Sequence, residues 1–200
     1  MSFDHQWDKV RRANPDHSAN YAQRWRKMVA AGHDIGGEAR FVNAMSPRGA
    51  RILDAGCGTG RVGGLLIEEG HTVYGVDLDE FLISVAEEDY PSGEWHTGDL
   101  ADFDFAEANI TDIDVAFCAG QVMSFLDPAS RRQTLDNINS TLKHGGRFVS
   151  GFGAGRGYDF DDFAEDIKAV GMYVDQRFST WELHPFEPGS DFLVLIAQRL

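Results

Sequence analysis

The feature that most constrains the fold is a regular alternation of strand and helix patterns from Arg51 to Ser150. Short apolar runs alternate with stretches whose apolar residues recur at the spacing of one helix face. Such alternation is typical of parallel strands joined by crossover helices, and it predicts an α/β fold. The expected strands cover Arg51–Ala55, Thr72–Val76, Glu94–Thr97, Ile113–Cys118 and Arg147–Ser150.

The segments between these strands carry helix start and stop signals. Asp79 is a good N-cap, Pro128 suits the first turn of a helix, and Gly70 and Gly171 are natural stops. The expected helices cover Gly60–Glu69, Asp79–Glu88, Asp127 to about Lys143, and Phe160–Val170. The acidic stretch 102–108 forms either a loop or a helix.

The end of the chain departs from this alternation. Two β-like runs, Tyr173–Trp181 and Asp191–Gln198, are joined by a link that contains HPFEPGS. So short a link suits an antiparallel pair, since a parallel pair needs a crossover of a dozen or more residues. The sequence therefore predicts a doubly wound α/β sheet with helices on both faces and an antiparallel finish.

The first 47 residues form a separate segment ahead of a core domain over residues 48–200. Helices are expected over Asp16–Ala31 and Glu38–Met45. Trp7, Tyr21 and Trp25 make this segment rich in aromatic side chains. Two interpretations stay open: the segment is a lid over a binding site, or it packs against the sheet.

Composition excludes some classes of function. The formal net charge of −14 disfavours a nucleic-acid partner, because nucleic-acid-binding proteins neutralise phosphates with Lys and Arg. No apolar run is long enough to cross a membrane, and the start lacks the apolar core of a signal peptide, so we expect a cytoplasmic protein. Cys57 and Cys118 have neither metal-ligand nor disulfide-framework spacing. We expect a monomer or homodimer that holds no metal.

A glycine-rich turn, Asp54-Ala55-Gly56-Cys57-Gly58-Thr59-Gly60, follows the first strand. In an open α/β sheet, ligands bind beyond the carboxyl ends of the strands, so this turn must pass close to a ligand. Gly56 and Gly58 lack the Cβ atom that would block close approach of the backbone. The glycines alone leave open a dinucleotide, a phosphate, a nucleoside or a loop without a ligand.

Three acids, Asp54, Asp77 and Asp99, end three successive strands on one rim of the sheet. Asp77 can accept hydrogen bonds from both ribose hydroxyls of a nucleoside, and Asp99 can accept one from an adenine amino group. Each is alternatively an N-cap or a loop acid. An acidic rim repels phosphates, so these carboxylates favour a cationic nucleoside ligand over a dinucleotide.

Five segments resemble, in order and spacing, the motifs of class I S-adenosylmethionine-dependent methyltransferases of small-molecule type: LDAGCGTG, VYGVDLD, GDL, DVAFCAGQVMSFL and LKHGGRFV. The resemblance covers about Arg51–Leu200. It implies a Rossmann-like, seven-stranded sheet whose last strand is antiparallel. It also implies S-adenosylmethionine as cofactor, S-adenosylhomocysteine as product and a small-molecule acceptor. Cys118-Ala119-Gly120-Gln121 departs from the proline-rich motif of enzymes that methylate amino groups of DNA bases or glutamine, which disfavours those acceptors.

The resemblance further implies how the methionine and ribose parts of the cofactor are bound. The backbone of Gly56 and Gly58 would approach the methionine part, and Asp54 would lie near its ammonium group. Asp77 would hold the ribose, with Leu78 packed beside the adenine.

At the adenine, Asp99 would contact the amino group and the Leu100 N–H the ring nitrogen. Tyr21 and Arg24 match only loosely the residues that close over the cofactor in this family; Arg24 either pairs with the cofactor carboxylate or is solvated. The full set of expected cofactor residues is Tyr21, Arg24, Asp54, Ala55, Gly56, Cys57, Gly58, Asp77, Leu78, Asp99, Leu100, Ala119, Gly120 and Gln121.

Methyl transfer is an in-line displacement at a carbon that the neighbouring sulfonium activates. Alignment of the acceptor and exclusion of water can supply much of the rate, and a base is needed only for a protonated acceptor. His184 is one candidate base, in a link where Trp181 and Phe186 would line an acceptor pocket; it is alternatively a surface histidine. His17 and His33 are weaker candidates.

Two other functions compete with this interpretation. The first is a catalytically silent protein that binds S-adenosylmethionine as a sensor or partner subunit. The second is a nucleotide-dependent oxidoreductase, against which Asp54 in the turn and the antiparallel ending both count.

Overall fold

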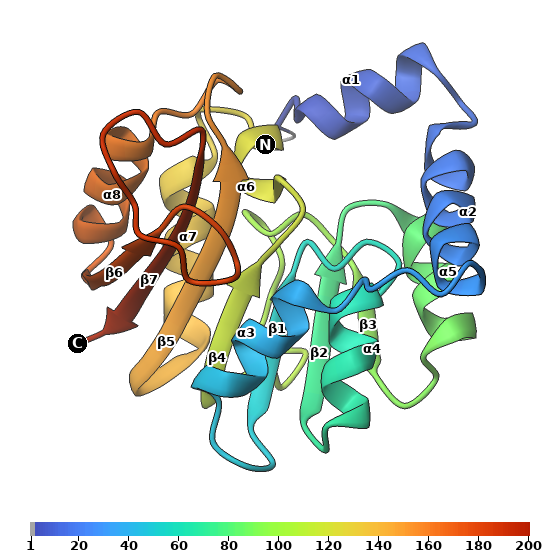
Figure 1. Ribbon diagram of the computed structural model, residues 1–200, viewed down its shortest axis with the longest axis horizontal. Helices are drawn as coiled ribbons and strands as arrows, with labels where there is room; N and C mark the ends of the chain where they lie inside the picture. The colour runs from blue at the N-terminus through green and yellow to red at the C-terminus, as the bar shows by residue number, and fades with distance from the viewer. Residues whose placement is uncertain (1–2) are drawn as a thin grey trace.

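The computed structural model describes residues 3–200 and contains one seven-stranded sheet in the order β3-β2-β1-β4-β5-β7-β6 (Figure 1). Strand β7 is antiparallel to both of its neighbours, and the other pairs are parallel. The predicted doubly wound sheet with an antiparallel last strand is confirmed. The strands are β1 (Arg51–Ala55), β2 (Thr72–Asp77), β3 (Glu94–Thr97), β4 (Ile113–Cys118), β5 (Leu142–Gly153), β6 (Met172–Phe178) and β7 (Phe192–Arg199).

Helices cover both faces of the sheet. Helices α3, α4 and α5 contribute to one apolar layer, and α7 and α8 to the layer on the opposite face. Helix α1 instead lies beyond the carboxyl ends of the strands, and α2 packs beside α5 (Figure 1). The helices are α1 (Gln6–Ala13), α2 (His17–Ala30), α3 (Gly37–Met45), α4 (Arg61–Glu68), α5 (Glu80–Asp89), α6 (Val122–Phe125), α7 (Arg131–Thr141) and α8 (Phe160–Ala169).

The central strands are buried on both faces, as parallel strands covered by helices must be. In β1, Ile52 belongs to the layer under α3 and α4, whereas the next residue, Leu53, belongs to the layer under α7 and α8. Phe117 and Ala116 divide in the same way on β4. This alternation explains the continuous apolar runs in the sequence.

Several predicted boundaries were wrong. Helix α7 begins at Arg131, because residues 127–130 form a turn in which the Ser130 N–H donates to the Asp127 carbonyl (2.9 Å). It ends at Thr141, and β5 begins at Leu142, which pairs with β4. The acidic stretch 102–108 forms turns, and α1 and α6 lie in segments where no helix was predicted.

The N-terminal segment has two structural parts. Helix α3 packs on the sheet through Phe41, Val42 and Met45, whereas α1 lies beyond the strand ends and α2 packs beside α5. Helix α2 confirms the helix expected near residues 16–31. Residues 1 and 2 of the expected lid lie outside the described residues. Within residues 3–200, the structure has no helix with the length and hydrophobicity that a membrane crossing requires.

Candidate cofactor and active site

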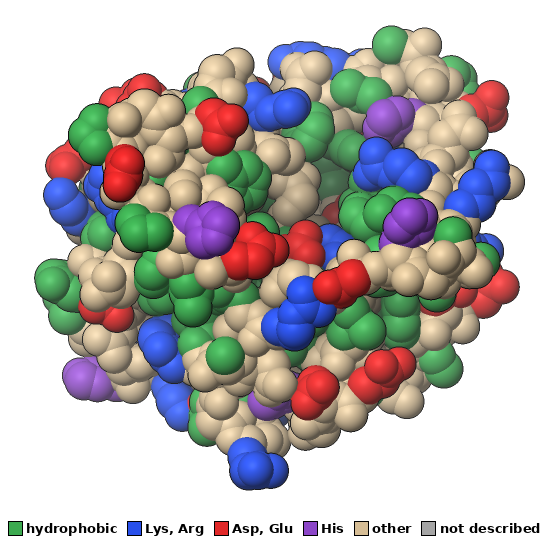
Figure 2. Space-filling model, in the orientation of Figure 1, with side chains coloured by type: hydrophobic (Ala, Val, Ile, Leu, Met, Phe, Trp, Pro, Cys, Tyr) green, Lys and Arg blue, Asp and Glu red, His purple; other side chains and the backbone are tan. Residues whose placement is uncertain are grey.

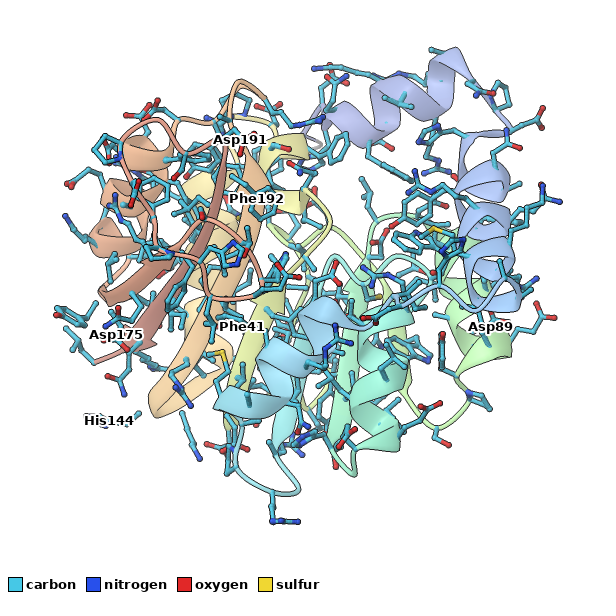
Figure 3. The ribbon with its side chains drawn as sticks, viewed as in Figure 1. Phe41, Asp89, His144, Asp175, Asp191 and Phe192 are labelled. Carbon is cyan, nitrogen blue, oxygen red and sulfur yellow. The ribbon has the colours of Figure 1, made fainter. Side chains whose placement is uncertain are left out.

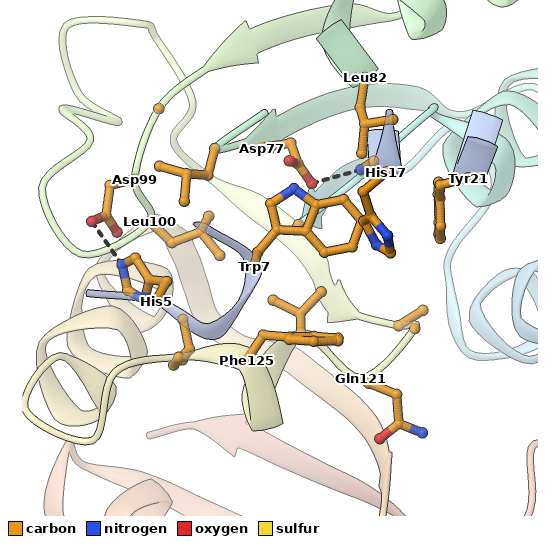
Figure 4. A pocket seen from close by; sticks show the side chains of 18 of the residues that line it. His5, Trp7, His17, Tyr21, Asp77, Leu82, Asp99, Leu100, Gln121 and Phe125 are labelled. Atoms are coloured by element: carbon orange, nitrogen blue, oxygen red, sulfur yellow. Dashed lines mark hydrogen bonds and ion pairs between the residues drawn. The ribbon is translucent and has the colours of Figure 1, made fainter. Parts of the chain in front are cut away.

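A cavity of about 330 Å³ lies between the carboxyl ends of the parallel strands and helices α1 and α2. Figure 2 shows the hollow in the surface, and Figure 4 shows its side chains. Most of the residues expected at the cofactor line it: Tyr21, Arg24, Gly56, Gly58, Asp77, Leu78, Asp99, Leu100, Ala119, Gly120 and Gln121. The lining also includes His5, Trp7, His17, Leu82, Gly98, Val122, Phe125 and Leu126.

The glycine turn presents bare backbone to this cavity. Gly56 and Gly58 have φ angles of 83° and 53°, in the left-handed region that favours glycine. A Cβ atom on Gly56 would lie 2.5 Å from the Val122 side chain, and one on Gly58 would point at Tyr21 from 3.6 Å. The close approach of backbone to cavity that the sequence predicted therefore depends on these two glycines.

Asp77, at the end of β2, is held by the backbone. Its Oδ2 accepts from the Gly58 N–H (2.8 Å) and its Oδ1 from the Asp79 N–H (2.9 Å). Burial raises the pKa of Asp77 to about 6, although these two hydrogen bonds favour the ionised form. The turn after β1 thus orients a carboxylate whose remaining lone pairs are available to a ligand.

Asp54 lies beneath the turn and not on the lining. Only 2% of it is exposed, and its Oδ2 accepts from the Gly63 N–H at the start of α4 (3.2 Å). Burial raises the pKa of Asp54 to about 8, against the opposing effect of Arg61. Ala55 and Cys57 are likewise buried and outside the lining. In the structure these residues support the turn from below.

Asp99 and Leu100 follow β3 at the other end of the cavity. Asp99 Oδ1 accepts from the Ala101 N–H, and its Oδ2 lies 2.9 Å from His5 Nε2 (Figure 4). Burial raises the pKa of Asp99, but the His5 and Ala101 contacts outweigh it and leave the pKa below its usual value. Among residues 3–200, the Leu100 N–H donates to no protein acceptor. It is therefore free for a ligand.

A second buried carboxylate, Asp79, attaches the N-terminal helices to the core. As predicted, it is the N-cap of α5, and it has no exposed surface. Its Oδ2 also accepts from the Trp7 Nε1–H (2.9 Å) and the Ser18 hydroxyl, and lies 3.4 Å from Arg11 Nε. The sequence indicated the cap but carried no signal for these contacts, which join residues far apart in the chain.

Aromatic side chains enclose the middle of the cavity. The Trp7 ring meets Tyr21 and Phe125 edge to face, with centroids 5.6 and 5.8 Å apart, and His17 at 4.9 Å (Figure 4). The Arg24 guanidinium lies 5.1 Å from the Tyr21 centroid. These contacts come from α1, α2 and α6, two of which were not predicted. The cavity therefore has an aromatic wall on the side of α1, α2 and α6.

Only one of the three histidine candidates lies at this cavity. His17 lines it, whereas His33 is exposed beside a shallow groove on α2. His184 is exposed in the link between β6 and β7. In the same link, Trp181 packs against Phe41 of α3, with ring centroids 5.3 Å apart. Figure 3 labels Phe41 on the face of the sheet that α3 covers. The link residues do not reach the cavity lining.

Comparison with known proteins identifies the family. Residues 52–146 match the family model described as a methyltransferase domain. A crystal structure of a TehB-like SAM-dependent methyltransferase from Corynebacterium glutamicum is 51% identical, with a TM-score of 0.89 over 94% of this chain and 100% of that one. The chain belongs to the class I S-adenosylmethionine-dependent methyltransferases. The resemblance recognised in the sequence is confirmed.

Curated methyltransferases are more distant relatives. A protein of Geobacillus sp. (strain WCH70) named as a methyltransferase is 28% identical over 143 residues, 68% of this chain and 54% of its own length. The ubiquinone biosynthesis O-methyltransferase of Thiobacillus denitrificans is 35% identical over 94 residues, 46% of this chain and 40% of its own length. The chain spans about half the length, or less, of the curated relatives it matches.

Proposed function

We propose that this class I methyltransferase moves the methyl group of S-adenosylmethionine to a small-molecule acceptor and releases S-adenosylhomocysteine. One observation carries the proposal. The fold brings the glycine turn, the oriented Asp77 carboxylate, Asp99 and the free Leu100 N–H onto the lining of a single cavity. Three further cavities of the described residues do not combine groups of this kind.

The chemistry of this donor set fits the cofactor. Asp77 presents acceptors to two ribose hydroxyls, and Leu78 offers an apolar surface to a purine. Asp99 can accept from a 6-amino group while the Leu100 N–H donates to the neighbouring ring nitrogen. Arg24 also lines the cavity, and its guanidinium can pair with the carboxylate of the cofactor. When bound, the sulfonium supplies a methyl carbon that is already activated.

We further propose that α1 and α2 act as the lid of this site. Their aromatic and polar side chains form one wall of the cavity, while α3 belongs to the core. A closed lid would keep water from the acceptor and hold it in line with the methyl carbon. Of the three histidines, His17 is then the one placed to take a proton from an acceptor.

The acceptor class follows from charge and size. A cavity of about 330 Å³ with few charged groups suits a small molecule, and a net charge of −14 works against a nucleic acid. We propose a monomer or homodimer acting in the cytoplasm, where thiols such as those of Cys57 and Cys118 stay reduced.

Ligand-induced thermal stabilisation tests the cofactor. S-adenosylmethionine and S-adenosylhomocysteine should each raise the Tm, whereas NAD and NADP should not; stabilisation by NAD alone would contradict the proposal. Turnover then separates an enzyme from a silent binder. Formation of S-adenosylhomocysteine from S-adenosylmethionine with a panel of small oxygen, nitrogen, sulfur and carbon acceptors supports catalysis. Binding without turnover on any acceptor supports the sensor or partner subunit.

A further inference from the structure

The chain ahead of α1 crosses the end of the cavity where Asp99 lies. The Asp4 N–H donates to Asp127 Oδ2 (3.0 Å), and the Asp127 N–H donates in return to His5 Nδ1 (3.0 Å). His5 is only 4% exposed, although it stands at the beginning of the described chain. A surface histidine near a chain end needs no such pairing. The arrangement therefore holds the imidazole ring in one orientation.

This orientation decides where the imidazole proton is. Because Nδ1 accepts a hydrogen bond, the proton of the neutral ring is on Nε2, which lies 2.9 Å from Asp99 Oδ2 and donates to it. Asp99 Oδ1 accepts from the Ala101 N–H (2.9 Å). Both carboxylate oxygens are thus engaged as acceptors, and Asp99 shows only lone pairs to the cavity.

We propose that His5 is a positioning residue that makes the site select a 6-amino purine over a 6-oxo purine, acting through Asp99. The inference rests on the proposed function, since it concerns recognition of the cofactor in the same cavity. A 6-amino group donates, so it complements a carboxylate held as an acceptor. A 6-oxo group would bring its oxygen against that carboxylate, and its ring N–H would meet the free Leu100 N–H.

The surrounding charges agree with this role. Asp8 of α1 and Asp127 act on His5 in addition to Asp99, and the charge of each of these carboxylates raises the pKa of the imidazole. Without His5, Asp99 would keep only the Ala101 N–H, and its side chain would be free to turn away from the purine. Selection of the amino group would then weaken, while the rest of the cavity would be unchanged.

The test compares two ligands that differ only at purine position 6. Dissociation constants of S-adenosylhomocysteine and S-inosylhomocysteine are measured by calorimetry, the weaker ligand by displacement of the stronger. The proteins are the wild type, His5→Phe, which keeps the ring volume but cannot donate, and His5→Gln, which keeps an N–H donor. His144→Gln, at the opposite end of the sheet (Figure 3), is the matched control.

In the wild type and in His144→Gln we expect S-adenosylhomocysteine to bind at least 100-fold more tightly than S-inosylhomocysteine. In His5→Phe this ratio should fall about tenfold, because only the amino ligand loses a contact, and His5→Gln should recover most of it. Equal weakening of both ligands would mean that His5 only holds the chain in place, and would overturn the proposal. So would tighter binding of S-adenosylhomocysteine to His5→Phe, which would make His5 a competitor for the amino site.

Failure of the proposed function looks different. If wild-type protein binds neither ligand, the cofactor assignment falls and the role of His5 falls with it. If the wild type binds S-adenosylhomocysteine but His5→Phe leaves the ratio unchanged, only the role of His5 is wrong. Thermal unfolding of each variant confirms that the comparison is made on folded protein.

Discussion

Two parts of the N-terminal segment are attached to the core in different ways. Helix α3 lies on the sheet, outside the cavity lining, and buries Ala39, Phe41, Val42 and Met45. Helices α1 and α2, which form the N-terminal wall of the cavity, bury only Ser18 and Ala22. This wall is attached by a small apolar cluster, in which Ala22, Trp7 and Tyr21 pack on Leu82 and Val85 of α5, and by polar contacts with Asp79, with Asp99 and with the end of α5.

The two kinds of attachment differ in strength. Each large apolar side chain that is fully buried stabilises a fold by about 1.5–3 kcal/mol. Exposed ion pairs such as Arg26–Asp89, with side chains 45% and 30% exposed, contribute about 0–1 kcal/mol each. We therefore expect α3 to contribute most to the stability of the fold, and α1 and α2 to move away from the core more easily. This difference also explains how a cavity covered by α1 and α2 can admit a cofactor.

The largest expected effect is on the stability that α3 provides. Phe41→Ala removes a buried ring that packs on Phe178 and Trp181, and should lower the free energy of unfolding by about 3–4 kcal/mol. Urea denaturation measures this free energy. Val29→Ala on α2, where the side chain is 53% exposed, should change stability by less than about 0.5 kcal/mol. Similar losses in both variants would remove the distinction between α3 and the N-terminal wall.

Asp77→Ala tests whether the core side of the cavity carries cofactor affinity. Loss of two hydrogen bonds to a charged acceptor should weaken binding of S-adenosylhomocysteine about 100-fold, close to 3 kcal/mol. Calorimetry gives the value. Asp175→Ala, an exposed carboxylate on β6 (Figure 3), is the control and should bind as the wild type does. An unchanged affinity in Asp77→Ala would show that the ribose lies elsewhere.

The buried carboxylate beneath the turn should make stability depend on pH. Among the described residues, Asp54 accepts a hydrogen bond from the Gly63 N–H alone. Its pKa of about 8 exceeds the ordinary value of 3.8, so the folded chain binds a proton that the unfolded chain releases, and stability falls as pH rises towards 8.

Between pH 6 and 8, above the pKa of about 6 of Asp77, Asp54 should dominate this fall. The side chain in Asp54→Asn cannot titrate, so the free energy of unfolding of this variant should fall less steeply with pH than that of the wild type. The two slopes should differ by about 1 kcal/mol per pH unit. Denaturant titrations at pH 6, 7 and 8 without ligand measure both slopes. Parallel slopes for wild type and variant would refute the assignment to Asp54.

Asp79→Asn should release the N-terminal wall without unfolding the core. The amide can still cap α5, but it is a weaker acceptor for Trp7 and Ser18. The rate of amide hydrogen exchange in α1 and α2 should rise about tenfold, which corresponds to a free energy of opening lower by roughly 1.4 kcal/mol, and the rate in α3 should be unchanged. Asp159→Asn, at the N-cap of α8, is the matched control. Faster exchange in α3 as well would mean that α3 opens together with the N-terminal wall.

The strand-end acids and the glycine turn were predictable because they are local. The alternation of apolar runs located the strands, and Gly56, Gly58, Asp77 and Asp99 sit where those runs end. The position of each of these residues follows from the sequence of a single βα unit. Patterns of period two and 3.6 carry that information directly.

The N-terminal wall was not predictable in the same way. Helix α1 has the sequence QWDKVRRA, in which only Trp7 and Val10 are large apolar residues on one face, so its apolar stripe is too short to identify a helix. Its attachments, Trp7 to Asp79 and His5 to Asp99, join residues far apart in sequence. The opposite error was made for His184. The topology of the last two strands suggested that this residue lies near the cavity, but the link packs on α3 through Trp181.

The smallest expected effects concern the histidines outside the cavity. His33→Ala and His184→Ala should leave kcat/KM within about twofold of the wild type, since small changes of surface groups alter free energies by about 0.5 kcal/mol at most. Initial-rate kinetics on an accepted substrate provide the measurement. A loss of more than tenfold in either variant would place the acceptor near that residue and outside the aromatic wall.

Hydrogen exchange with and without S-adenosylhomocysteine tests the central claim most directly. The ligand should slow exchange in the Gly56–Gly60 turn and at Leu100, and also across α1 and α2, with α3 unaltered. That pattern would show a cofactor bound between a fixed core and a closing N-terminal wall. Binding of S-adenosylhomocysteine without protection of the turn or of α1 and α2 would contradict it.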